Sequence, residues 1–276
     1  VDGGQKVQDF SLQVTPMPAQ LRNRVDDHGN ERAYFALHSA HRELSVMAKS
    51  QVWVANRYEG LDPTRGATCG EVRDMLTYRA HAPFEPASEY LYPSPYVPNL
   101  EPLREYAAQS LWPDRPLAEA AIELMQRIYD DFDYAPASTD ISTPVLDVFI
   151  ERKGVCQDFA HLMLACLRVN GLAGRYVSGY LLTQPPEGQP ALVGADASHA
   201  WVSVWVPGLG QDLAGDWLDL DPTNACVPGH HHVRVAHGRD FGDVTPLRGV
   251  IRGGGEHTFL VRVTTRLISG AGQAPV

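Results

Sequence analysis

The sequence is short of positive charge. Lysine and arginine together number 23 against 33 aspartates and glutamates, so the formal net charge is −10 at pH 7. A chain with this balance repels phosphate backbones and anionic lipid surfaces. We therefore expect no nucleic-acid partner and no membrane partner.

Cysteines and long apolar runs are also scarce. The four cysteines, Cys69, Cys156, Cys166 and Cys226, include no C-x-x-C pair and are too few for a disulfide framework. No run approaches the ~18 uncharged apolar residues that a membrane span needs, and the first residues do not resemble a signal peptide. We expect a cytoplasmic location, although the sequence begins at Val1 and not at Met, which leaves a targeting segment before it open.

The remaining composition is typical of a globular protein. The chain has 276 residues, of which 44% are hydrophobic and 20% charged. This length suits about two domains, or one large domain with an appendage. We expect a β domain over residues 1–60, a connector with short helices over 61–115, a main core over 116–245 and a C-terminal strand region over 246–276.

Alternating apolar residues from about Gln8 to Val54, with a turn signal over 26–30, predict antiparallel strands. Residues 81–99 hold too much proline for the interior of a helix or strand and predict an ordered connector. Helical spacing then predicts a helix over 116–134 and a second from Pro144 to Gly154.

A third helix is predicted from Cys156 to Val169, with Asn170-Gly171 as its stop signal. Strand-like segments follow over 175–182, 198–206 and 217–220, and a last one over 257–267. This order predicts an α+β fold in which helices pack on an antiparallel sheet.

Cys156 is a candidate nucleophile because it lies at the predicted start of a helix. Unpaired backbone N–H groups and the helix dipole favour a thiolate at this position. A buried structural cysteine is the competing interpretation. His161 cannot be its base, since five residues turn it about 140° around the helix.

His199 is a candidate base. In Ser198-His-Ala-Trp-Val-Ser-Val-Trp-Val206 it shares one strand face with Trp201, while the other face is entirely aliphatic and anchors the strand. In Trp217-Leu-Asp-Leu-Asp-Pro222, Asp219 and Asp221 share a face, and a carboxylate there can orient an imidazole. A structural histidine and an ordinary Asp-Pro turn are the competing interpretations.

Taken together, these segments resemble the transglutaminase-like superfamily. Its three motifs are matched by Gly154-Val-Cys-Gln-Asp-Phe-Ala-His161, Ser198-His-Ala-Trp201 and Trp217-Leu-Asp-Leu-Asp-Pro-Thr223. The chain is most similar to bacterial transglutaminase-like proteins described as candidate cysteine proteases. Their tail pattern is present in His232-Val-Arg-Val-Ala-His-Gly-Arg-Asp240 and in Arg252-Gly-Gly-Gly-Glu256.

The resemblance implies a papain-like core, here 116–245, behind an N-terminal β domain whose first strands are expected before Val1. It implies that Cys156 is the nucleophile, His199 the base and Asp221 the orienting carboxylate. Gln157 and Tyr134 are candidates for the oxyanion donor, and Trp201, Asp219 and His232 for the wall of the substrate site. Calcium dependence is not implied, because the calcium-binding extensions of animal transglutaminases have no counterpart here.

A histidine tract, His230-His231-His232 with His237, is a weaker candidate for a metal site. Consecutive histidines cannot all face one ion, so we interpret most of the tract as a solvated loop and expect no metal and no cofactor.

The predicted activity is acyl transfer on a peptide or protein carboxamide through a thioester, with hydrolysis favoured over transfer to an amine. An arylamine N-acetyltransferase-like enzyme is one alternative, because such enzymes use Cys, His and Asp in the same order at a similar chain length, and Arg152-Lys-Gly-Val-Cys156 matches their pattern in part. A catalytically silent peptide-binding module is the other, because fold resemblance alone does not establish activity.

Overall fold

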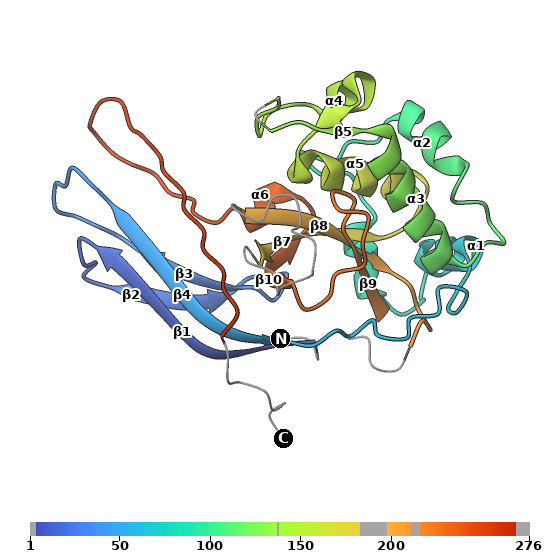
Figure 1. Cartoon of the computed structure of the whole chain (residues 1–276), viewed down its shortest axis with the longest axis horizontal. Helices are drawn as coiled ribbons and strands as arrows, with labels where there is room; N and C mark the ends of the chain where they lie inside the picture. Colours follow the sequence, from blue (N-terminus) through green and yellow to red (C-terminus); the bar gives the residue numbers. More distant parts are fainter. Residues whose placement is uncertain (1–3, 137, 183–197, 211–215, 269–276) are drawn as a thin grey trace.

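A computed structural model describes residues 4–136, 138–182, 198–210 and 216–268 of the chain. Figure 1 shows its N-terminal strands on one side, most of its helices on the other and a sheet between them. Among the described residues, no helix is both long and apolar enough to cross a membrane.

The N-terminal strands form two antiparallel pairs. The long strands β1 (Gln5–Thr15) and β4 (Ser45–Val54) pair with each other, and β2 (Leu21–Val25) and β3 (Glu31–Phe35) form a hairpin around the predicted turn. Asp26 stabilises that turn, because its carboxylate accepts from the backbone N–H groups of His28 and Asn30.

The connector holds the short helices α1 (Cys69–Leu76), η1 (Pro86–Tyr90) and α2 (Glu101–Ala108). The core helices are α3 (Leu117–Asp131), α4 (Val145–Glu151) and α5 (Cys156–Val169). The predicted start of α5 is confirmed. The end predicted for α4 is wrong by three residues, since Arg152 adopts a left-handed conformation (φ 56°) and ends that helix before Gly154.

The central sheet is antiparallel with strand order β10-β7-β8-β9. Its strands are β7 (Gly174–Leu181), β8 (Ser198–Trp205), β9 (Trp217–Leu220) and β10 (His232–Gly238). Helix α5 packs on β7 and β8, and α3 packs on β9. The aliphatic face of β8, with Ala200, Val202 and Val204, is completely buried, as the alternation predicts.

The prediction of a strand over 257–267 is wrong. The described residues 246–268 contain no helix and no strand, and Phe259 and Leu260 are largely exposed. Alternation specifies two faces, but a strand also needs a neighbouring edge whose N–H and C=O groups it can pair with. Strand β10, which the sequence analysis did not predict as a strand, occupies the edge beside β7. The short α6 (Phe241–Val244) follows it.

Candidate active site

The first residue of α5 is Cys156, and the residues around it fix where this helix begins. Asp158 accepts a 2.9 Å hydrogen bond from the backbone N–H of Val155 and a 2.5 Å bond from the hydroxyl of Thr139. Gly154 packs closely against Asp158, because a Cβ at position 154 would come within 2.9 Å of Asp158 Cβ. Cys156 is thereby held at the N-terminus of α5 and is partly exposed, whereas Cys69 and Cys166 are buried.

Tyr134 is brought to this helix start by a two-residue parallel pair. Strand β5 (Asp133–Tyr134) pairs with β6 (Lys153–Gly154), which places Tyr134 opposite Gly154. Burial raises the pKa of Tyr134, and the charge of Cys156 raises it further. Gln157 follows Cys156 directly in the chain and is half-buried, and the charge of Cys156 acts on Tyr134, so both remain candidates for the oxyanion donor.

His199 and Asp221 form a buried pair. Nε2 of His199 lies 2.8 Å from Oδ2 of Asp221, and both side chains are fully shielded from solvent. Burial alone would lower the pKa of His199, but Asp221, together with Cys156, raises it to about 10. Burial would raise the pKa of Asp221, but His199 and His232 hold it well below its usual range.

The two ring nitrogens of His199 therefore have different tasks. Nε2 is bound to Asp221, and Nδ1 makes no hydrogen bond that meets ordinary geometric limits within the described residues. Cys156 helps to raise the pKa of His199, and Nδ1 is the ring nitrogen that Asp221 does not occupy. This arrangement can hold an imidazolium beside a thiolate.

His232 reaches the same carboxylate oxygen. Its Nε2 lies 3.0 Å from Asp221 Oδ2, and the ring is almost completely buried. Trp201 is buried beside both histidines, with its ring 5.3 Å from that of His232 in an edge-on arrangement and 6.1 Å from that of His199.

Two further donors, which the sequence analysis missed, complete the shell of Asp221. Asn224 Nδ2 donates to Oδ2 at 2.8 Å, and the backbone N–H of Thr223 donates to Oδ1 at 3.0 Å. The second bond closes an Asx turn, which Asp221-Pro-Thr could have indicated.

His199, Asp221 and His232 each offer an atom within 4.8 Å of the others, a spacing that would admit a metal ion. Three donors already lie on the shared Oδ2 at 2.8–3.0 Å. The set therefore fits a hydrogen-bonded cluster better than a cation site. His230 and His237 diverge from it, since they contact the carbonyl of Val54 and the guanidinium of Arg175.

Asp219 does not join this cluster. Its Oδ2 forms buried ion pairs with Arg57 at 2.8 Å and with Arg234 at 2.6 Å, and its backbone N–H donates to the hydroxyl of Tyr58. Its position is that of a link between the chain after β4 and the central sheet. His161 was not expected to act as the base. It is buried against Tyr96 and Tyr176, and its Nε2 accepts from the backbone N–H of Phe241.

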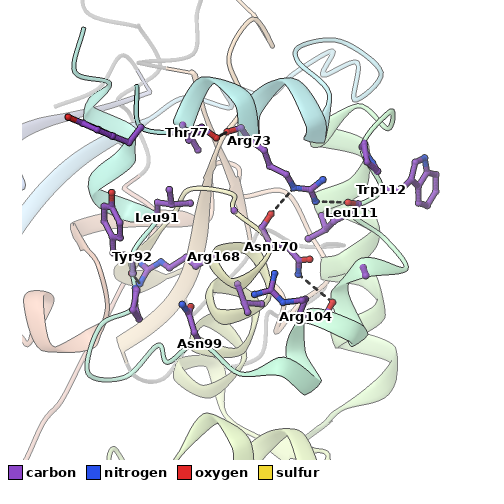
Figure 2. A pocket seen from close by; sticks show the side chains of 17 residues that line it. Arg73, Thr77, Leu91, Tyr92, Asn99, Arg104, Leu111, Trp112, Arg168 and Asn170 are labelled. Carbon is purple, nitrogen blue, oxygen red and sulfur yellow. Dashed lines mark hydrogen bonds between the residues drawn. The ribbon is translucent and has the colours of Figure 1, made fainter. Parts of the chain in front are cut away.

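A hollow of about 780 Å³ lies at the opposite end of α5. Figure 2 shows Arg73, Arg104 and Arg168 around it, and hydrogen bonds from Arg73 to the carbonyls of Asn170 and Leu111. Arg168 likewise donates to the carbonyl of Gly174. Because cations here satisfy carbonyls at and near a helix C-terminus, we interpret this hollow as structural.

Comparison with known proteins places the chain in a family. Residues 104–222 match the model of the transglutaminase-like superfamily, and residues 1–53 match the bacterial transglutaminase-like N-terminal region. An uncharacterized protein of Mycobacterium tuberculosis is 42% identical over 250 residues, which cover 90% of this chain and 78% of the relative. The chain belongs to the transglutaminase-like superfamily, whose members are typically cysteine proteases or transglutaminases.

Two other similarities are more limited. A protein-glutamine gamma-glutamyltransferase of Pseudomonas aeruginosa is 32% identical over 117 residues, which are 41% of this chain and 17% of that protein. The crystal structure of a candidate cysteine protease from Cytophaga hutchinsonii matches with a TM-score of 0.64 and 23% identity, over 88% of this chain and 74% of that one. This structural match supports the predicted α+β fold with a papain-like core.

Proposed function

We propose that this protein is a thiol-dependent acyl-transfer enzyme that acts on a peptide or protein carboxamide. The observation that carries the proposal is the buried bond between His199 and Asp221, which leaves the other ring nitrogen of His199 for the thiol of Cys156. In this proposal Cys156 is the nucleophile, His199 the base and Asp221 the orienting carboxylate, the three roles that covalent thiol catalysis needs.

In the proposed reaction the Cys156 thiolate attacks the carbonyl carbon. The backbone N–H of Cys156, with Tyr134 or Gln157, donates to the developing oxyanion. The C–N bond breaks as the His199 imidazolium gives its proton to the leaving amine, and a thioester remains. An acceptor then gives a proton to His199 and attacks the thioester, the C–S bond breaks, and the thiolate is restored.

We favour water as the acceptor. Cys156 is partly exposed, so water can reach a thioester formed on its sulfur. A second amine would need its own binding surface, and the triad itself is identical for both outcomes.

The test is the rate of iodoacetamide labelling measured against pH. Burial raises the pKa of Cys69 to about 11 and the pKa values of Cys166 and Cys226 to about 12, so labelling at pH 6–7 reports on Cys156. We expect a fast phase that disappears in Cys156→Ala, loses its low-pH part in His199→Ala and persists in Cys226→Ala.

Turnover then separates the reaction classes. We expect a carboxylic acid product from peptide amides. Incorporation of a fluorescent primary amine would identify a transglutaminase, and activity only with acetyl-CoA would identify an acetyltransferase. If Cys156 labels no faster than an ordinary thiol from pH 5 to 9, the proposal fails and a silent peptide-binding module is the better interpretation.

A further inference from the structure

We propose that His232 is a positioning residue that holds the Asp221 carboxylate in place for His199. The inference rests on the proposed function, since it assigns a support to the same site. It gives His232 a task different from that of a substrate-site wall.

The hydrogen bonds determine which ring atoms carry protons. A carboxylate accepts and does not donate, and the pKa of Asp221 lies well below its usual range. His199 and His232 must therefore both donate to Oδ2 from Nε2, at 2.8 Å and 3.0 Å. For His199 this leaves Nδ1 free to exchange a proton with Cys156.

The charged groups close to His232 already have partners of opposite charge. Asp221 is one anion and the His199 imidazolium is one cation, so the pair is balanced within a buried cluster. Asp219, on the same sheet face, is already bound by Arg57 and Arg234. His231, the preceding residue in the chain, is a further titratable group beside His232. What Asp221 needs from His232 is therefore the Nε2–H donor and not a further charge.

The ring of His232 is itself held rigidly. His232 opens β10 opposite Leu181 of β7, and the neighbouring carbonyl of His231 accepts from the N–H of Leu182. Trp201 packs edge-on against the ring. A donor fixed in this way limits rotation of the Asp221 carboxylate, which is the support that a reacting constellation needs.

The experiment compares His232→Leu with His232→Gln, since glutamine keeps a donor that reaches Asp221 and leucine does not. His231→Gln is the matched control beside it. In His232→Leu we expect Cys156 labelling at pH 6–7 and kcat to fall roughly 10- to 100-fold, the range that loss of one buried charge-assisted hydrogen bond implies.

The pH profile gives a second readout. Without His232 the Asp221 carboxylate is less well placed and raises the pKa of His199 less. The pKa of His199 then falls because of its burial, and the alkaline limb of activity moves to lower pH. We expect His232→Gln to restore most of the rate and the limb, with KM unchanged in all variants. Melting temperatures identify any variant whose loss reflects unfolding.

A third readout does not depend on the thiol. In a Cys156→Ala background, ¹⁵N spectra of the histidine rings should show both His199 and His232 protonated at Nε2, and Asp221→Asn should shift both signals. If either ring shows the Nδ1–H tautomer, the inference is overturned even where a variant folds poorly.

Three results of the rate measurements would also overturn it: His232→Leu labels like the wild type, a folded His232→Gln is as slow as His232→Leu, or only KM changes. Failure of the proposed function looks different. In that case the wild type labels slowly, or it labels fast and depends on His232 but turns over no amide.

Discussion

At the scale of single residues, Oδ2 of Asp221 accepts from His199, His232 and Asn224 while the carboxylate is completely buried. Such a carboxylate is stable only while its donors remain, because an unpaired buried charge is costly. The same bonds set the protonation of His199, so structure and predicted activity depend on one atom.

Asp221→Asn should lower kcat by roughly 10³- to 10⁴-fold, as in other triads that lose the orienting carboxylate. Without that charge, burial dominates and the pKa of His199 falls from about 10 toward or below its ordinary value. The alkaline limb of kcat/KM should therefore move down. Asp219→Asn is the matched control: it removes a buried charge that does not touch His199, so it should lower stability and leave the limb in place. Equal profiles for Asp221→Asn and wild type would refute the pairing.

His199 should also make stability depend on pH. Its pKa is about 10 in the folded chain against an ordinary 6.5, so its stabilisation is complete below about pH 6.5 and lost as the pH rises to 10. We expect the free energy of unfolding, measured in urea, to decline over this window more steeply for the wild type than for His199→Gln. Parallel curves would show that His199 gains no proton affinity on folding.

At the scale of elements, the sheet places the two histidines on either side of β7. His199 in β8 pairs with Gly179, and β10, which carries His232, pairs with the other edge of β7. A Cβ at position 179 would overlap the Trp201 indole and the Val233 carbonyl. The missing side chain of Gly179 therefore gives Trp201 its place beside both imidazoles.

Gly179→Ala should consequently destabilise the chain by about 1–3 kcal/mol through overpacking and slow Cys156 labelling. Gly210→Ala is the control, since a Cβ there meets nothing within 4 Å. Thermal unfolding and labelling rates check both effects. A Gly179→Ala variant as stable and as reactive as Gly210→Ala would contradict this account of the packing.

Many of the helices and strands could be predicted from the sequence, and the same physical reasons explain which features were missed. Helix α5 and strand β8 carry strong periodic signals because one face of each is aliphatic and buried. Strand β10 was missed because its polar side chains, including His232 and Arg234, bind other buried polar groups instead of forming an apolar face. Asn224 was missed because its role depends on how the turn after Asp221 closes.

At the scale of the whole molecule, polar contacts join the N-terminal strands to the core. Asn30 exchanges two hydrogen bonds with the backbone of His237, at 2.8 and 2.9 Å, and Arg32 donates to the carbonyl of Asp243. Gln5 exchanges two more with the backbone of Arg234. These contacts reach β10 and α6, so the N-terminal strands support the edge that presents His232.

Asn30→Ala should weaken that support. Losing both bonds to His237 should cost about 1–3 kcal/mol and speed amide hydrogen exchange in β10. Asn23→Ala, an exposed change on β2, should do neither. Unchanged exchange in β10 after Asn30→Ala would mean that the two regions are energetically independent.

The separation of Cys156 from His199 has a further consequence. The sulfur belongs to a helix and the imidazole to a strand, and the two are brought together by the packing of α5 on β7 and β8. The distance between the sulfur and the imidazole therefore depends on how closely the helix layer packs on the sheet. A loosened chain that kept its secondary structure would lose reactivity early, so the chemistry of one thiol would report on the order of the entire interior.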